Sequence, residues 1–568
     1  MSRDYLIAID FGTSYSGYVY SIAPRGAELV PNLRRWGQEY GHNTPKTPNC
    51  VLFDANGNFM HFGYEAKDKY LEMDKDDAAK NYFFENFKME LYNKKITKDL
   101  TIKDGRKRPM SALKVFSAAL RFLKDDALKT IFMNTSGTRF TAADFSWVLT
   151  VPAIWDNSAR QFMRDAAVEA GIVSSSSQDK LVIALEPEAA SVWCKKLPCD
   201  GFITEEHEGA ALQQTPGTQY VVVDCGGGTI DITVHEVLEG GALKELHKAS
   251  GNDKGGRRVN KRFNQCLREF FCGGLWEDYE REFPCEAQKF MYDFEIVKVA
   301  EGDVKMICYY NLCHLVEQNQ KKGKKVFNSV EGVSWARGKI LISKSKMESF
   351  FHESLVHITD SLCEILDSHS QIQYILLVGG FSQSRILCDH VRQQFSDRAR
   401  VLCPKNPQEA ILKGAVVFAR DQAVIRSRKS AFTYGVKTCV RYDESKHKSK
   451  FTNKEGDWCD VMFKKLVGID EDVGWDETRK YSFTPTERDH TAMNLEFYRT
   501  ERKSVTYVDE WGVEGPVACC TVAMPDTSKG MDRRVKLEVF FGSTEIRAKA
   551  TDLESNCTAS VKIDFISK

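Results

Sequence analysis

The sequence of 568 residues predicts a mixed α/β protein with two related lobes, followed by a domain made of strands. Three observations lead to this prediction. A strand–turn–strand pattern occurs twice, at 5–20 and 220–234; helices alternate with strands between and after these segments; and residues beyond about 430 show a period of two. The length also exceeds what one hydrophobic core usually organises, so more than one domain is expected.

The repeated pattern defines the two lobes. Each copy has an apolar run that ends in an aspartate, Asp10 or Asp224, then glycine and threonine, then a second run rich in β-formers. Because one motif is used twice far apart in the chain, we expect a first lobe at about 1–218 and a second at about 219–385.

Helices and buried strands complete the lobes. The apolar run 147–152 predicts a buried strand, and 158–170 predicts a helix with small and apolar residues on one face. Helical spacing over 347–366 leads into an apolar strand at 374–378. A turn and helix at 405–419 are expected to end the α/β part, so we assign 386–425 as a return to the first lobe.

The last part of the chain has the pattern of half-buried strands. Val535, Leu537 and Val539 alternate with Lys536 and Glu538. We therefore expect residues 426–568 to form a β-sandwich-like domain.

Composition limits the classes of partner and the location. Lys plus Arg and Asp plus Glu both total 79, so no global field attracts nucleic acid or an anionic membrane. The first apolar stretch is interrupted by Asp10, too early for a signal peptide or a membrane span. We expect no nucleic-acid partner, no transmembrane segment, and a cytoplasmic location, with the nucleus as the alternative.

The two turns have the chemistry of a phosphate site. Glycines between strands let backbone N–H groups approach phosphate oxygens, and Thr13 and Thr229 add hydroxyl donors. Asp10, Asp224 and Asp231 flank the same place, and Mg²⁺ is the usual reason to gather carboxylates beside a polyphosphate. One such turn alone is more often an ordinary hairpin, but two copies favour an ATP or ADP site with Mg²⁺ in a cleft between the lobes.

Five blocks, in order, resemble the superfamily of actin, sugar kinases and heat-shock ATPases: 10–16, 181–190, 224–231, 376–385 and 406–419. Segments 149–161 and 186–187 are similar to the seventy-kilodalton heat-shock chaperones, and the whole chain resembles a divergent subgroup of them. The resemblance implies a two-lobed actin-like ATPase domain of duplicated ribonuclease H-like lobes over 1–425, then a substrate-binding β domain without a helical lid.

The resemblance also implies roles for individual residues. The catalytic group would be Lys88, Glu186, Asp224 and Asp10. Magnesium would be held, through water, by Asp10, Asp224 and Asp231. Phosphates would be bound by Gly12, Thr13, Ser14, Tyr15, Gly226, Gly227, Gly228 and Thr229. Adenosine would be bound by Glu301, Lys305, Gly379, Gly380 and Arg385, with Lys305 on the same helix as Glu301. The alternative for Lys88 is an ordinary surface lysine.

Two segments depart from the pattern of the family. Residues 251–260 keep a glycine pair but carry Arg257, Arg258 and Asn260 where acidic residues are usual, so we expect no magnesium role there. The segment 423–430 is basic where the family has an apolar, acidic interdomain linker. Because docking would desolvate these charges, we expect the segment not to dock in the same groove, and coupling between the nucleotide and the β domain to be weaker.

Three functions remain open from the sequence. The first is a stress-response chaperone that hydrolyses ATP slowly and binds exposed segments of client proteins, with nucleotide exchange factors as further partners. The second is a nucleotide-dependent scaffold or recognition protein with weak or no hydrolysis, which binds signalling partners. The third is a small-molecule kinase of the sugar-kinase type, although no acceptor base is identifiable.

Overall fold

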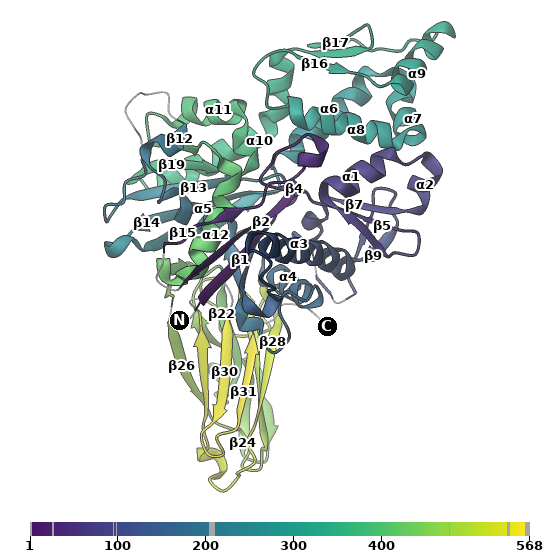
Figure 1. Cartoon of the computed structure of the whole chain (residues 1–568). Coiled ribbons are helices and arrows are strands. Elements are labelled where there is room, and N and C mark those ends of the chain that lie inside the picture. Colours follow the sequence, from purple (N-terminus) through teal and green to yellow (C-terminus); the bar gives the residue numbers. More distant parts are fainter. Residues whose placement is uncertain are drawn as a thin grey trace.

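The computed structural model describes residues 3–24, 28–94, 96–97, 99–203, 211–475, 477–541 and 546–562. These residues form a broad α/β part and a narrower part of strands that extends from one side of it (Figure 1). The fold is therefore mixed α/β, as the sequence predicts.

The first large sheet is built around the first repeated hairpin. Its strand order is β11-β10-β1-β2-β3, with β4 beside β2. β1 is antiparallel to β2 and parallel to β10. The bounds are β1 Arg3–Phe11, β2 Tyr15–Pro24, β3 Asn32–Leu33, β4 Thr47–Pro48, β10 Ser146–Val151 and β11 Leu181–Leu185.

The second large sheet is built around the second hairpin. Its order is β12-β20-β19-β13-β14-β15-β21-β25, and β13 is antiparallel to β14 and parallel to β19. The bounds are β12 Phe202–Ile203, β13 Gln219–Cys225, β14 Ile230–Val237, β15 Leu243–Asn252, β19 Ile372–Val378, β20 Arg400–Pro404, β21 Ile425–Lys429 and β25 Asp472–Gly474. Each sheet thus places a parallel strand beside the first strand of its hairpin.

Strand alternation divides the core into layers. Ile7 and Ile9 of β1 pack under α3 (Ala112–Asn134) and α4 (Asn157–Glu169), whereas Leu6 and Ala8 face the second sheet. Two helices, α5 (Glu186–Cys194) and α12 (Pro407–Arg420), fill the layer between the sheets. On the far side of the second sheet lie α6 (Arg257–Phe270), α10 (Lys344–Ser368) and α11 (Arg385–Phe395).

In Figure 1, smaller elements lie to the right of the first large sheet, and others lie above and to the right of the second. Beside the first sheet lie β5 Cys50–Phe53, β6 Phe59–Phe62, β7 Tyr82–Glu85, β8 Thr101–Lys103, β9 Pro109–Ser111, α1 Gly63–Glu72 and α2 Lys75–Lys80. Beside the second lie α7 Leu275–Glu282, α8 Pro284–Val297, α9 Tyr310–Lys321, β16 Val304–Ile307, β17 Val333–Ala336 and β18 Lys339–Ile342.

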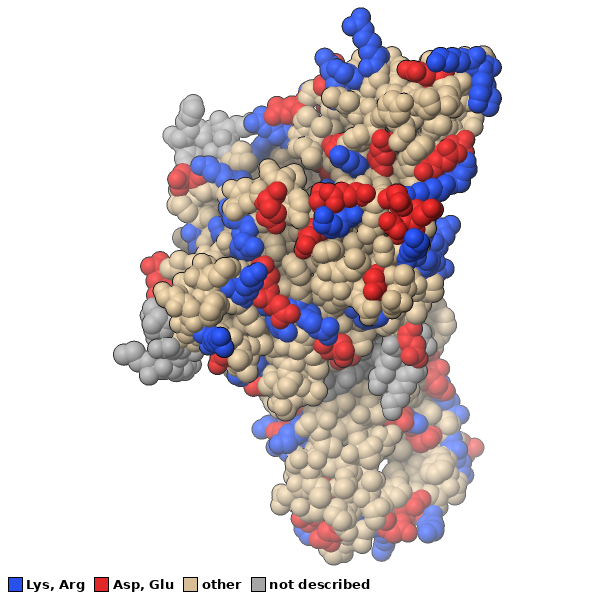
Figure 2. Space-filling model, turned by 45° about the vertical axis from the view of Figure 1, so that its right-hand side comes forward, with Lys and Arg blue, Asp and Glu red and all other residues tan. Residues whose placement is uncertain are grey.

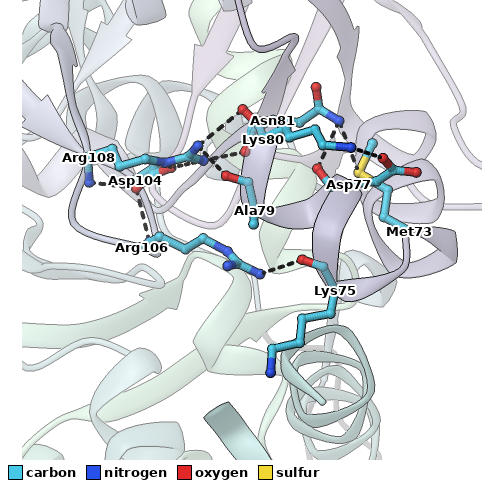
Figure 3. A network of polar contacts seen from close by, with 9 residues as sticks. All are labelled: Met73, Lys75, Asp77, Ala79, Lys80, Asn81, Asp104, Arg106 and Arg108. Carbon is cyan, nitrogen blue, oxygen red and sulfur yellow. Dashed lines mark hydrogen bonds and ion pairs between the residues drawn. The ribbon is translucent and has the colours of Figure 1, made fainter. Parts of the chain in front are cut away.

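Arg108 ties the turn between β8 and β9 to the end of α2 (Figure 3). Its guanidinium binds Asp104, at 2.6 Å, and donates to the carbonyls of Ala79, at 2.7 Å, and of Asn81. At this small junction of α2, β8 and β9, charged hydrogen bonds make the contact that apolar side chains make elsewhere.

The strands beyond β21, apart from β25, form two packed sheets. One has the order β23-β24-β22-β27-β28 and the other β26-β29-β30-β31, with apolar side chains of both sheets between them. The bounds are β22 Thr433–Arg441, β23 Phe451–Asn453, β24 Gly456–Val467, β26 Thr478–Phe483, β27 Ala492–Thr500, β28 Val513–Ala523, β29 Val535–Phe540, β30 Arg547–Asp552 and β31 Thr558–Lys562. We call these two sheets the β part.

The segment that joins the two parts docks as a strand. β21 pairs in parallel with β15 and antiparallel with β25, so it extends the second large sheet. β21 begins at residue 425, where the sequence predicts the boundary between the α/β domain and the β domain. That boundary stays a prediction.

On the face shown in Figure 2, basic and acidic side chains lie among one another over both parts. Among the described helices, none has the length together with the apolarity that a membrane crossing requires.

Candidate functional site

The two glycine turns meet face to face. A β-carbon added to Gly227 would lie 2.4 Å from Ser14 Oγ, and one added to Gly228 would lie 2.5 Å from Thr13 Oγ1. Such distances leave no room for a side chain, so only glycine permits this approach. The turns meet at the base of a cavity of about 380 Å³ between the two large sheets.

Most of the predicted site residues line this cavity. They are Asp10, Gly12, Thr13, Ser14, Tyr15, Lys88, Glu186, Asp224, Gly226, Gly227, Gly228, Thr229, Gly379 and Gly380. Asp231 is fully buried beside them, where its Oδ1 accepts a hydrogen bond of 2.9 Å from the backbone N–H of Ile154. The structure does not bring Glu301, Lys305 or Arg385 to the cavity lining.

The helix expected to carry both Glu301 and Lys305 is not formed. α8 ends at Val297, and Lys305 lies on the strand β16, where its exposed side chain alternates with buried Val304 and Met306. This period of two places residues 304–307 beside β18 and not on a helix. Arg385 pairs with Glu301 at 3.0 Å, and both side chains are largely exposed.

Lys88 is a buried cation and not the surface lysine of the alternative interpretation. Its side chain is 1% exposed, and its Nζ lies 2.6 Å from Glu186 Oε1. The ammonium also faces the ring of Trp155, at 5.2 Å from the centroid. Burial raises the pKa of Glu186 to about 7, although Lys88 opposes this shift. Glu186 is therefore close to its point of half-ionisation near neutral pH.

Lys46 is a site residue that the sequence analysis missed. Its Nζ lies 2.5 Å from Asp10 Oδ2, and Asp10 Oδ1 accepts a hydrogen bond of 3.0 Å from Thr150. Lys46 reaches the cavity because β4, which follows it directly, pairs with β2 beside the first turn. In the sequence Lys46 is only a lysine in a polar loop, because the pairing of β4 with β2 is a tertiary contact.

The buried carboxylates fit a divalent cation held through water. Asp224 Oδ1 and Asp231 Oδ2 are buried with no hydrogen-bond partner. Burial, together with neighbouring acids, raises the pKa of Asp224 well above its ordinary value. In the part of the chain that the structure describes, no three or more side chains of His, Cys, Asp and Glu converge closely enough to ligate a metal directly. These acids would therefore accept hydrogen bonds from the water shell of Mg²⁺.

The cavity lining contains a further pair that the sequence analysis missed. Glu295, near the end of α8, and Lys298, its C-cap, line the cavity and lie 2.5 Å apart. Phe351 and Phe381 stack beside them with centroids 5.7 Å apart. The Glu-x-x-Lys spacing on a helix was the available signal, because residues three apart share one face.

The first turn of α5 connects this cavity to β21, the strand that leads into the β part. Glu186 points to Lys88, and Glu188, two residues later, binds the guanidinium of Arg428 on β21 through bonds of 2.6 and 2.8 Å. Both partners of the second pair are largely buried. The expectation that the basic segment would not dock is therefore wrong, because a buried acid compensates the charge of Arg428.

Comparison with known proteins identifies the family. The family model described as Hsp70 protein matches residues 7–429. The chain belongs to the Hsp70 family. It is 33% identical to heat shock 70 kDa protein 12A of Mus musculus, over 99% of this chain and 91% of that protein. It is 31% identical to heat shock 70 kDa protein 12B of Homo sapiens, with the same coverage.

More distant Hsp70 relatives match only part of the chain. The chaperone protein DnaK of Metamycoplasma hominis is 29% identical over 45% of this chain and 34% of that protein. The resemblance to a divergent heat-shock subgroup is thus confirmed, since the 12A and 12B proteins match nearly the whole of this Hsp70-family chain.

Proposed function

We propose that this Hsp70-family chain binds ATP and ADP with Mg²⁺ in the cavity between its two large sheets and hydrolyses ATP slowly. The observation that carries the proposal is the direct opposition of two glycine turns beside the buried Lys88–Glu186 pair. Family membership supports it, because relatives of this chain carry chaperone names.

The residues divide the chemistry as follows. Backbone N–H groups and the hydroxyls of Thr13 and Thr229 would bind the phosphates, which glycine allows to approach closely. Glu186, with its pKa near 7, would orient the attacking water and accept its proton. Lys88 would balance the charge that develops on the transferred phosphoryl group. Bound Mg²⁺ would supply charge neutralisation between the phosphates and the carboxylates.

The β part completes the proposal. We infer that residues 426–568 form a domain that binds exposed segments of client proteins in the cytoplasm, and that the two large sheets are duplicated lobes. The matching strand order around β1 and β13 supports the duplication. The Glu188–Arg428 pair supports a nucleotide-dependent position of this domain, because it lies one helical turn from the cavity.

One observation favours the second candidate, a nucleotide-dependent scaffold with little hydrolysis. Lys46 occupies one oxygen of Asp10, so one of the three acids expected to organise the metal's water shell is already paired. This candidate shares the nucleotide site and differs in the rate of the chemical step and in its partners, which would be signalling proteins.

The test is nucleotide binding by calorimetry, followed by single-turnover hydrolysis. We expect ADP with Mg²⁺ to bind the parent, and Lys88→Met and Asp224→Asn to lower the hydrolysis rate by about 10²–10³-fold, the usual cost of losing one electrostatic group. Lys94→Met is the control, since Lys94 is exposed on the same segment and pairs only with Glu90. Equal rates in all variants would refute the catalytic assignments, and no binding would refute the site.

A further inference from the structure

A second cavity, of about 790 Å³, adjoins the first. The two cavities share the wall formed by Ser14, Tyr15, Gly228, Lys67, Arg257, Tyr292 and Glu295. The shared residues Ser14 and Gly228 belong to the two phosphate turns, so the second cavity begins where a nucleotide's terminal phosphate would end. Its volume lies in the range of small-molecule sites.

Two cations in the shared wall have no anionic partner. Lys67 of α1 lies with its Nζ 3.7 Å from the centroid of Tyr292, and Arg257 stands at the first residue of α6. Neither forms an ion pair within 4 Å with any residue that the structure describes. Burial lowers the pKa of both groups, although the carboxylates of Glu85 and Glu295 oppose this shift.

The two acids that act on both cations, Glu85 and Glu295, are already engaged. Glu85 accepts hydrogen bonds from Tyr292, at 2.8 Å, and Gln288, at 3.0 Å. Glu295 binds Lys298 at 2.5 Å and also accepts from Asn260. The wall therefore offers two unpaired cations and no unengaged carboxylate.

Other arginines of the second cavity differ from Arg257. Arg258 lies 3.3 Å from Glu353, and Arg268 lies 2.9 Å from Glu277. Their charges are compensated within the protein, so among these three arginines Arg257 alone lacks an ion pair with a residue that the structure describes.

We propose that the second cavity binds a small anionic molecule, through a phosphate or carboxylate group held between Lys67 and Arg257, beside the nucleotide. The proposal rests on the proposed nucleotide site for the position of the anion. Paired nitrogen donors of a lysine and an arginine match the oxygens of either group, and partial burial strengthens such charge-assisted bonds.

The test measures the thermal midpoint of the full chain saturated with a non-hydrolysable ATP analogue and Mg²⁺. Inorganic phosphate and succinate serve as separate probes, each against chloride at equal ionic strength. We expect one probe to raise the midpoint while the analogue is bound, and its identity distinguishes a phosphate ligand from a carboxylate ligand. Lys67→Gln and Arg257→Gln should each weaken the probe about tenfold, the usual effect of losing one charged hydrogen bond.

Arg262→Gln is the matched control. It removes one arginine from the same helix, but Arg262 pairs with Glu353 at 2.9 Å and lines neither cavity. The proposal is overturned if Arg262→Gln weakens the probe as much as Arg257→Gln does. It is also overturned if neither probe acts once the analogue is bound, since the anion then competes for the nucleotide's own phosphate site.

Analogue binding is measured first and separately by calorimetry. If the analogue binds and no probe acts, only this inference fails. If the analogue does not bind, the proposed function fails. Lys67→Gln, Arg257→Gln and Arg262→Gln then test the anion site in the nucleotide-free chain. The anion site is refuted there too if Arg262→Gln weakens the probe as much as Arg257→Gln does.

Discussion

Gly379 lies where two backbone segments and a carboxylate converge. Its φ is +85°, and an added β-carbon would lie 2.3 Å from Asp224 Oδ1 and 2.4 Å from the carbonyl oxygen of Cys225. We expect Gly379→Ala to lower the free energy of unfolding by about 1–3 kcal/mol, through strain and displacement of Asp224. ADP affinity, measured by calorimetry, should fall at least about tenfold if Asp224 moves by more than a fraction of an ångström.

Gly380 provides the control for this change. It lines the same cavity, yet an added β-carbon there would meet nothing within 4 Å. Gly380→Ala should therefore change neither stability nor affinity appreciably. A similar loss in both variants would show that the crowding at Gly379 is not the cause.

The Lys88–Glu186 pair makes stability depend on pH. Because the pKa of Glu186 in the folded chain, about 7, exceeds its unfolded value of about 4.3, the folded state retains the proton over this interval. The contribution of Glu186 to stability is thus most favourable below about pH 4 and is lost as pH rises to about 7. We expect urea unfolding of Glu186→Gln to show a smaller decrease in stability across this interval than the parent.

Removing only the cation should destabilise the folded chain. Lys88→Met leaves Glu186 buried without its partner, which costs about 3–5 kcal/mol when a buried pair is broken. The double variant Lys88→Met/Glu186→Gln should recover most of that loss. Additive losses in the double variant would mean that the two side chains do not interact as the 2.6 Å contact indicates.

At the scale of single residues, the sequence predicts the site residues that lie in a repeated motif. It misses residues that reach the site only through tertiary contacts. The glycines and aspartates of the two turns were identifiable, because two copies of one turn chemistry reinforce each other. Lys46 was not, since its position depends on Asp10, which is distant in the sequence, and the local Glu295-x-x-Lys298 spacing was overlooked. The roles assigned to all these residues stay predictions.

β21 is a strand whose buried positive charge is compensated by an acid on another element. Its residue Arg428 is buried against Glu188 and lies 5.5 Å from the ring of Trp475. We expect Arg428→Ala to leave Glu188 uncompensated, to reduce stability by about 3–5 kcal/mol, and to increase amide hydrogen exchange in residues 425–429.

Arg426→Ala is the control on the same strand, because the Arg426 side chain is exposed. It should leave hydrogen exchange of β21 unchanged. If both variants expose β21 equally, pairing of the backbone with β15, and not the buried ion pair, holds the strand in place.

Whether a segment forms a helix or a strand was predictable wherever its apolar residues kept a regular spacing over several residues. Both hairpins, the helices α4, α10 and α12, and the alternating strands of the β part have clear periods. Residues 301–305 are too short for a period to be decisive, and pairing with β18 determines their conformation. Docking of β21 was mispredicted because the compensating acid, Glu188, is 240 residues away in the chain.

For the molecule as a whole, Mg²⁺ and protons should compete for the base of the main cavity. The pKa values of Asp224 and Glu186 are both raised by burial, so at acidic pH protons neutralise the acids that a cation would neutralise. We expect Mg²⁺ to raise the thermal midpoint of the ADP-bound chain more at pH 8 than at pH 6. Calorimetry in buffers of different ionisation enthalpy should detect proton release when Mg²⁺ is added.

The variant Asp224→Asn tests the origin of this effect. It removes one titrating acid while keeping the shape of the side chain, so proton release should decrease. Unchanged proton release would assign the titration to groups outside the cavity.

The first turn of α5 makes contacts in two directions. Glu186 is fixed to Lys88 and Glu188 to Arg428, and successive residues of a helix rise only 1.5 Å along its axis. The two carboxylates are therefore rigidly connected through less than one turn of backbone. Sliding or rotating this helix cannot relax one anchor without straining the other, so the position of β21 is tied through α5 to the side chain that would face the hydrolytic water.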